Sequence, residues 1–260
     1  LISSSVFVLF GAMQRYEGWF FALVITCVLA LYVLIVTRNF RKAEGVTLLY
    51  AGFAFIGPLL WLVWNRVLFG GWFNFAVGRY SSRYQQADLL SHGLLPSYEN
   101  IGNTLLHIFY ATERVLGIPL LVVGSVGVMY LLWRCVYQKQ WRYLLFFVLG
   151  AHIPYFFLNL YVGNAVIFVP ELYPHKLFNF RYTVTFLPFF ALSAALLTVK
   201  LKHGVQILLL LVVTQNMVWM LSGNVIVVNE GKEGFAGLSA QESRIKAGHW
   251  IGSSYDTGLI

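Results

Sequence analysis

The sequence contains few charged residues. Asp, Glu, Lys and Arg together make up 11% of its 260 residues, whereas hydrophobic residues make up 59%. A water-soluble domain of this length needs far more polar side chains to cover its surface, so this composition excludes an ordinary soluble fold. The mean hydropathy of +0.72 predicts an integral membrane protein instead.

The sequence also lacks the short motifs by which many catalytic and metal sites are recognised. It contains no HExxH, Walker-type phosphate loop, CxxC or GxSxG, and no metal-binding cluster is predicted. Its two cysteines, Cys27 and Cys135, fall at predicted membrane depths too different for a disulfide to span. The sequence therefore indicates no metal, and it leaves any cofactor unknown.

A continuous basic stripe is missing as well. The formal net charge is +8, but the basic residues lie between apolar segments, so nucleic acid is not a predicted partner. A helix needs about 20 residues to cross the hydrocarbon of a membrane. The apolar stretches near that length predict an all-α polytopic membrane protein with about seven transmembrane helices: Leu1–Met13 (truncated), Trp19–Val36, Val46–Trp64, Gly117–Trp133, Tyr143–Tyr161, Tyr182–Val199 and Gly204–Leu221.

The charges between these stretches predict an orientation. Three short loops contain eight Lys and Arg residues and a single acid, Glu44, whereas the rest of the chain contains ten basic and nine acidic residues. Because short cytoplasmic loops are enriched in Lys and Arg, we expect the three loops in the cytosol: Arg38–Glu44, Arg134–Arg142 and Lys200–His203. The exterior segments are then Gln14–Gly18, Asn65–Leu116, Val162–Arg181 and the tail from Ser222.

The two ends of the sequence predict a larger protein. Leu1 lies inside an apolar run without an initiator Met, so we expect this chain to be the C-terminal part of a longer polypeptide. Residues 1–221 are the predicted transmembrane domain, and residues 222–260 the start of an exterior soluble domain. That tail is predicted to form a helix over Ser239–Gly252, capped by Ser239 with Glu242, and a strand that begins at Leu259.

Two of the predicted exterior stretches are an amphipathic helix and a short polar turn. Ile101–Val115 predicts a helix that lies along the membrane interface. The turn Gln14–Trp19 places Arg15 and Glu17 at the start of a helix. These two residues can pair with each other at a functional site, or the turn can be a simple interfacial anchor through Tyr16 and Trp19.

The long exterior loop contains a polar, aromatic stretch directly after an apolar segment. Within Gly78–Gln86, Arg79 and Arg83 can grip a phosphate with several N–H donors, and Gln85 and Gln86 can bond sugar hydroxyls. Tyr80 and Tyr84 offer faces for stacking. The alternative is a re-entrant loop packed on the helical bundle.

A third constellation lies in the last exterior loop, over Glu171–Tyr182. Arg181 stands at the mouth of an apolar segment, where it can extend to the membrane surface or face a lipid-linked phosphate. His175 and Lys176 add positive charge to that mouth. His107 and His152 are isolated in the sequence, and we interpret them as structural.

These stretches together resemble the bacterial polytopic glycosyltransferases of the GT-C superfamily, most closely the membrane mannosyltransferase-like (family 39-type) proteins. Members often carry an RYEGW turn, a WN…FGDPLYF…GPYSA…QQ loop after the next span, and F…RY at a late span. The matching residues here are Arg15-Tyr16-Glu17-Gly18-Trp19, Trp64-Asn65 with Phe69-Gly70, Gly78-Arg79-Tyr80-Ser81 with Gln85-Gln86, Phe180-Arg181-Tyr182, and the tail stretch Ala247–Ile251.

The resemblance implies inverting transfer of a sugar from a polyprenyl-phosphate-linked donor to an acceptor at the exterior face of a bacterial cell membrane. It places the catalytic Asp upstream of Leu1, so no residue of this chain is predicted to be the catalytic base. The residues expected to bind donor phosphate or substrate are Arg15, Glu17, Arg79, Tyr80, Arg83, Gln85, Gln86, Lys176, Arg181 and Tyr182.

The sequence departs from the family pattern at two places. Gly71-Trp72 stands where Asp-Pro is usual, and Gly78-Arg79 stands where Gly-Pro is usual. A non-catalytic membrane subunit of a larger complex therefore remains an alternative. A second alternative is a flippase or polymerase of lipid-linked oligosaccharides, since such proteins also present exterior arginines.

Overall fold

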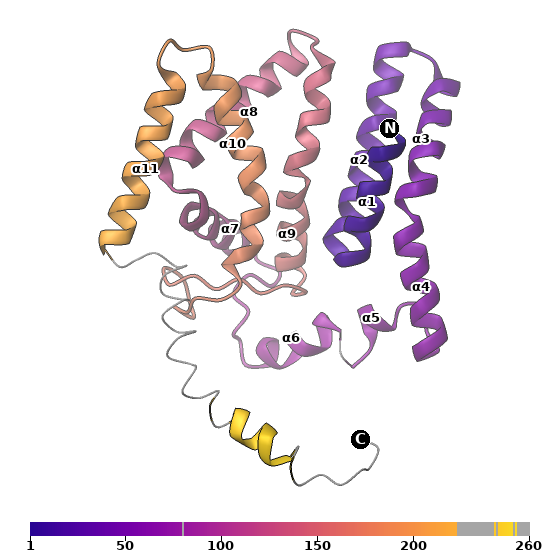
Figure 1. Ribbon diagram of the computed structural model, residues 1–260, viewed down its shortest axis with the longest axis vertical. Coiled ribbons are helices and arrows are strands. Elements are labelled where there is room, and N and C mark those ends of the chain that lie inside the picture. The colour runs from indigo at the N-terminus through magenta and orange to yellow at the C-terminus, as the bar shows by residue number, and fades with distance from the viewer. Residues whose placement is uncertain (80, 223–241, 243, 252, 254–260) are drawn as a thin grey trace. The chain divides into compact units, whose positions relative to one another are not determined.

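The regular secondary structure is helical in the part of the chain that the computed structural model describes, which is residues 1–79, 81–222, 242, 244–251 and 253. Over those residues the only extended pairing is an isolated bridge between Phe168 and Phe178, without a strand (Figure 1). The predicted all-α class is confirmed. The chain divides into two compact units, Leu1–Leu208 and Leu209–Ile260. The predicted domain boundary after residue 221 stays a prediction.

The helices follow one another with short connections up to the longer loop between α9 and η2, residues 162–179. In chain order they are α1 Ile2–Gln14, α2 Tyr16–Thr37, α3 Phe40–Ala54, α4 Ile56–Phe69, α5 Asn74–Val77, α6 Ser82–Ser91, α7 Ile101–Leu116, α8 Ile118–Val136, the 3₁₀ helix η1 Trp141–Ala151, α9 His152–Tyr161, the 3₁₀ helix η2 Phe180–Phe186, α10 Leu187–Thr198 and α11 Gly204–Ser222. The last of these crosses the boundary between the two units.

Five helical segments of the described residues are long and apolar enough to cross a membrane. They are α2, α8, Trp141–Tyr161 (η1 with α9), Phe180–Thr198 (η2 with α10) and α11, and a sixth results if the bent pair of α3 and α4 is one span. The predicted count of seven is not confirmed, because α1 has 13 residues and a crossing needs about 20.

Prolines explain where the predicted spans change direction or winding. The predicted segment Val46–Trp64 is divided at Phe55, where α3 and α4 meet at 44°. Pro58 has no N–H to donate to the carbonyl four residues earlier, which is that of Ala54. Pro154 and Pro188 likewise stand in the first turn of α9 and α10, directly after a 3₁₀ segment.

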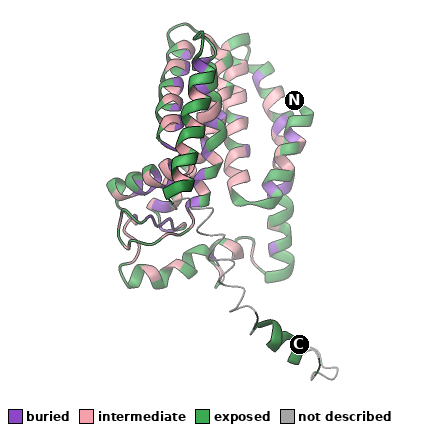
Figure 2. Ribbon diagram, turned by 60° about the vertical axis from the view of Figure 1, so that its left-hand side comes forward, coloured by how far each residue is buried: buried purple, intermediate pink, exposed green. Residues whose placement is uncertain are grey.

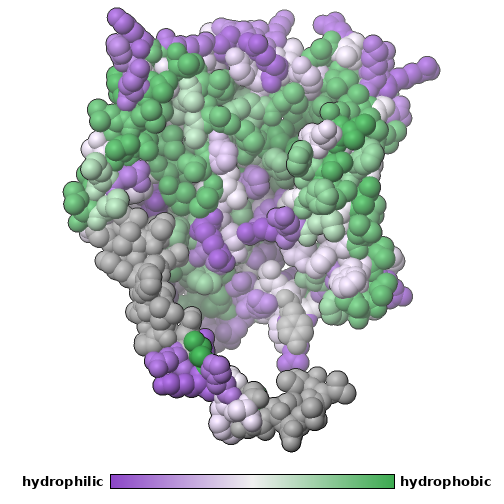
Figure 3. Space-filling view, viewed as in Figure 1, coloured by the Kyte–Doolittle hydropathy of each residue, from purple (hydrophilic) through white to green (hydrophobic). Residues whose placement is uncertain are grey.

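The helices carry apolar side chains on the sides that are exposed. Buried and exposed residues alternate along the same helices (Figure 2). On α8, for example, Val122, Val126 and Met129 are 55%, 52% and 66% exposed. Figure 3 shows apolar side chains over much of one face, with hydrophilic side chains along its upper edge. Such a surface is unfavourable in water and favourable in lipid, which supports an integral membrane protein.

Small residues allow close contact between α8 and α10. A Cβ added at Gly127 would lie 2.3 Å from the carbonyl oxygen of Ser193. This position therefore requires glycine, as is typical of helices that pack closely within a membrane.

The helix predicted over Ile101–Val115 is present as α7. Asn100 caps it, since its side chain accepts a hydrogen bond from the backbone N–H of Asn103 at 2.9 Å. Ile101, Leu105 and Phe109 are exposed, whereas Ile108 is buried. Its predicted place at the membrane interface stays a prediction.

The second unit is described only in part beyond α11. Residues 242, 244–251 and 253 of the tail are helical, and Glu242 forms an ion pair with Lys246 at 3.0 Å. The predicted cap Ser239 and the strand from Leu259 lie outside the described residues.

Candidate functional site

The site begins at the one-residue connection between α1 and α2. Arg15 is extended and stands at the N-cap of α2. Close packing of the two helices fixes this turn, because a Cβ on Gly18 would lie 2.6 Å from the carbonyl oxygen of Gly11. The indole N–H of Trp19 donates to the carbonyl of Ala12 at 2.8 Å. Together these contacts hold the RYEGW segment against the end of α1.

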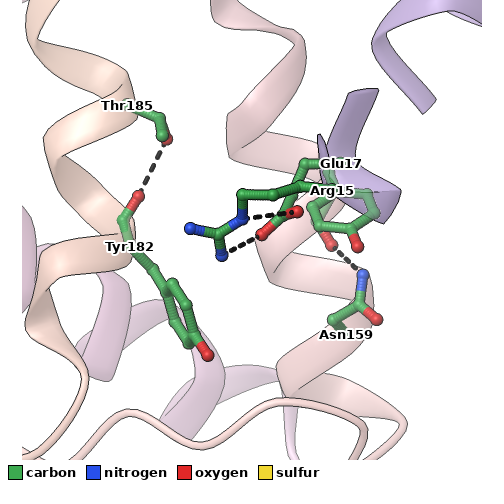
Figure 4. Close-up of polar contacts among 6 residues, drawn as sticks. Arg15, Glu17, Asn159, Tyr182 and Thr185 are labelled. Carbon is green, nitrogen blue, oxygen red and sulfur yellow. Dashed lines mark hydrogen bonds and ion pairs between the residues drawn. The ribbon is translucent and has the colours of Figure 1, made fainter. Parts of the chain in front are cut away.

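Arg15 and Glu17 form a two-point ion pair. Arg15 Nη2 donates to Glu17 Oε1 at 2.6 Å, and Arg15 Nε donates to Glu17 Oε2 at 3.0 Å (Figure 4). The Arg15 guanidinium carbon also lies 5.7 Å from the centre of the Tyr182 ring, within range of a cation–π contact. The hydrogen bond to Glu17 raises the pKa of Arg15 above its ordinary value, so this residue stays cationic.

An aromatic group forms the wall beside this ion pair. Tyr16 stacks on Phe75 with ring centres 4.9 Å apart and an interplanar angle of 18°. Trp19 contacts the same Phe75 ring edge-on at 5.4 Å, and Trp61 lies 6.3 Å from Tyr16. These contacts join α2 to α4 and α5, so the segment after α4 is held at the start of α2.

The opposite wall comes from α9 and η2. Phe156 stacks on Tyr182 with ring centres 5.0 Å apart. Asn159 Nδ2 donates to the backbone carbonyl of Tyr155, one turn earlier, at 2.9 Å. This bond fixes the Asn159 amide at the end of the span, near the ion pair (Figure 4).

A cavity of about 440 Å³ lies between these walls. It is lined by Gln14, Arg15, Tyr16, Glu17, Phe75, Ala76, Ser82, Arg83, Tyr155, Phe156, Asn159, Asn164, Ala165 and Tyr182. The volume is in the range of small-molecule sites. Guanidinium groups suit a phosphate, amide and hydroxyl groups suit sugar hydroxyls, and the aromatic faces suit an apolar or sugar ring.

The cavity brings together part of each predicted constellation. Arg15, Glu17, Arg83 and Tyr182 line it, and they come from three stretches that are distant in sequence. Five other predicted residues do not line it, of which Gln86 is half-buried and the rest are exposed: Arg79, Gln85, Gln86, Lys176 and Arg181. Tyr80 lies outside the described residues. The assignment of substrate-binding roles to all ten residues stays a prediction.

Sequence reasoning missed the contribution of α9. Tyr155 and Asn159 lie four residues apart, on the same side of a helix, near the exterior end of the predicted span Tyr143–Tyr161. That spacing of two polar side chains in an apolar stretch was a usable signal. Asn164, in the loop after α9, offered none.

The segment between α9 and α10, residues 162–186, is held to α7 by two polar contacts. Arg114 Nε donates to Glu171 Oε1 at 3.0 Å, and the hydroxyl of Thr183 donates to the carbonyl of Ala111 at 3.0 Å. These contacts position η2, and with it Tyr182.

His107 and His152 were interpreted as structural; His107 lies on α7, and His152 lies on α9, the helix that contributes Tyr155 and Asn159 to the cavity. His107 Nδ1 is 2.7 Å from the carbonyl of Asn103, while its Nε2 is buried without a partner. Burial lowers the pKa of His107, so the imidazole is neutral at pH 7. His152 stacks on Phe21, with ring centres 5.2 Å apart.

No group of three or more His, Cys, Asp and Glu side chains able to hold a metal ion occurs among the described residues. Comparison of the chain with known protein families, with characterised proteins and with solved structures found no match.

Proposed function

We propose that this chain is part of a GT-C-type membrane glycosyltransferase whose cavity binds a polyprenyl-phosphate-linked sugar. The observation that supports this proposal is the cavity itself, which gathers Arg15, Arg83 and Tyr182 from the three stretches that resemble the family. The proposal includes a bacterial cell membrane as location and an exterior opening of the cavity, as the distribution of Lys and Arg predicts.

We assign the side chains of the cavity different roles according to their chemistry. Arg83 would bind the donor phosphate at the rim, with the N–H groups of Arg15 that Glu17 does not engage. Asn159 and Asn164 would bond the sugar hydroxyls, and Tyr16 with Phe75 would supply an aromatic face. These groups bind and orient the donor and stabilise the departing phosphate. None of them is assigned the removal of the acceptor proton.

A measurement of lipid phosphate binding tests the roles assigned to these side chains. The full-length protein, purified in detergent, would be titrated with undecaprenyl phosphate and followed by native mass spectrometry. We expect saturable binding that Arg83→Ala weakens about tenfold, because one charge-assisted contact is lost. Arg79→Ala is the matched comparison: Arg79 does not line the cavity, so the proposed division of roles, unlike the wider prediction for all ten residues, expects loss of this charge to leave binding unchanged.

Two results would reject the proposal. One is the absence of saturable binding to undecaprenyl phosphate, and the other is an equal loss in Arg79→Ala and Arg83→Ala. Binding without transfer from a radiolabelled polyprenyl-phosphate sugar would favour the non-catalytic subunit. Movement of the lipid across a liposome membrane would favour the flippase.

A further inference from the structure

A second group of polar side chains lies where α8 and α10 end and η1 begins. The hydroxyl of Tyr130 accepts hydrogen bonds from Arg134 Nη1 at 3.1 Å and from Lys200 Nζ. The guanidinium carbons of Arg134 and Arg142 lie 5.3 and 5.2 Å from the centre of the Tyr143 ring. We refer to Tyr130, Arg134, Arg142, Tyr143 and Lys200 as the basic cluster.

The basic cluster lies far from the cavity along the helices. Lys200 follows Tyr182 by 18 residues of mostly helical chain, which corresponds to roughly 27 Å or more. It is therefore separate from the site proposed above, and its ligand need not be the same.

The positive charge of the basic cluster has no neighbouring carboxylate to balance it. Between Ile118 and His203 the sequence has one acidic residue, Glu171, and this residue pairs with Arg114. No described carboxylate forms an ion pair with Arg134, Arg142 or Lys200. Two cations that donate to one hydroxyl repel each other, and a bound anion would remove that repulsion.

Tyr130 is arranged to take part in binding such an anion. A phenol has one O–H donor and two acceptor lone pairs. Arg134 and Lys200 occupy the acceptor positions, so the hydroxyl hydrogen is left to donate. The Tyr143 ring lies within cation–π range of the guanidinium groups of Arg134 and Arg142 and helps to hold them in place. The cluster thus offers an N–H donor from each cation and one O–H donor. The oxygen atoms of a phosphate accept hydrogen bonds from such donors.

The surroundings identify the source of the anion. Arg142 and Lys200 are exposed, and the cluster stands at the ends of apolar helices, at the level where lipid head groups lie. Leu132, Trp133 and Val136 of α8, next to Arg134, are 44%, 47% and 51% exposed and offer an apolar surface for acyl chains. We propose that the basic cluster binds the phosphate of an anionic phospholipid head group in the leaflet on this side.

A lipid titration tests the proposal. The thermal unfolding midpoint of the detergent-purified protein would be followed against added dioleoylphosphatidylglycerol, with zwitterionic dioleoylphosphatidylcholine, whose net charge is zero, as the comparison. We expect a saturable rise with the anionic lipid alone, and about tenfold weaker apparent affinity in Lys200→Ala. The matched control, Lys202→Ala, loses the same charge in the same loop and should behave as the wild type.

A second variant keeps the test decisive if Lys200→Ala fails to fold. Tyr130→Phe retains the aromatic face but removes the hydroxyl, so it should weaken the response to the anionic lipid in the same way. An equal loss in Lys202→Ala would overturn the proposal in favour of general attraction to negative lipid. So would an equal stabilisation by inorganic phosphate, which would identify a site for the free ion.

Discussion

Arg15 is oriented by contacts on two sides of its guanidinium group. Glu17 engages Nε and Nη2, and the Tyr182 ring lies on another side. An arginine has five N–H donors, so those on the side away from Glu17 remain able to bind an oxyanion (Figure 4). The pairing of Arg15 with Glu17 could be anticipated from their positions two residues apart. The contact with Tyr182 could not, because no local pattern relates residues so distant in sequence.

The backbones of α1 and α2 approach each other closely at Gly18, which leads to a prediction about the stability of the protein. Gly18→Ala would place a Cβ against the carbonyl of Gly11 and the Cα of Ala12. We expect it to destabilise the protein by about 1–3 kcal/mol, since the two helices must separate. Thermal unfolding in detergent measures this effect.

Gly11 provides the control for that change. A Cβ at Gly11 meets nothing within 4 Å, so Gly11→Ala should leave stability unchanged or raise it by up to about 1 kcal/mol through helix propensity. Equal destabilisation by both substitutions would show that α1 and α2 do not pack as described.

At the scale of elements, α7 and the loop between α9 and η2 carry two carboxyl groups with opposite pKa shifts. Burial raises the pKa of Glu113, only partly opposed by Arg114. Burial would also raise the pKa of Glu171, but the hydrogen bond from Arg114, the backbone N–H of Glu171 and the charge of Arg114 together outweigh it and lower that pKa. Glu113 therefore contributes stability at low pH that is lost as pH rises through its raised pKa. Glu171 contributes stability above pH about 4.3 that is lost as pH falls through its lowered pKa.

Substitution of each acid by Gln should separate the two effects. At pH 7, Glu113→Gln should raise the unfolding midpoint, and Glu171→Gln should lower it by about 2–4 °C, the equivalent of about 1 kcal/mol. Near pH 3.5 both differences from the wild type should shrink. Midpoints measured between pH 3.5 and 8 check this, and shifts of the same sign at pH 7 would contradict it.

The elements show which features of the fold local sequence can predict. Hydropathy located five of the seven predicted segments within about three residues of helices long and apolar enough to cross a membrane, because an apolar stretch is a local property. The bend at Phe55 and the 3₁₀ segments before Pro154 and Pro188 were not predicted. Each depends on which backbone carbonyls lose their hydrogen-bond donor and on how the neighbouring helices pack. Helix packing is not a local property of the sequence.

The candidate site illustrates the same limit. Arg79 and Arg83 are equivalent in sequence, yet α6 begins between them: Ser81 caps it by accepting from the backbone N–H of Tyr84 at 3.2 Å. Arg83 thus lies in the first helical turn and lines the cavity, while Arg79 precedes the cap and does not. Residue types indicated phosphate binding, but the start of one short helix decides which arginine reaches the cavity.

For the whole molecule, the distribution of charge predicts that α6 is exterior and the loop after α10 cytosolic. The test uses a chain in which Cys27 and Cys135 are replaced by Ala, with Asp88→Cys or Lys202→Cys added. A membrane-impermeant maleimide should label Asp88→Cys in intact cells, and Lys202→Cys only after permeabilisation. The reverse pattern would place the cavity on the cytosolic side and refute the proposed exterior reaction.

The tight winding of η2 decides where Tyr182 points. A 3₁₀ helix advances 120° per residue and an α-helix 100°, so the five residues from Tyr182 to the first residue of α10 would unwind by roughly 100° if they became α-helical. Tyr182 would then swing around the helix axis, away from Arg15. A change of hydrogen-bond register within η2, the first part of the apolar segment Phe180–Thr198, would thus be enough to disassemble this side of the cavity while α10 kept its winding.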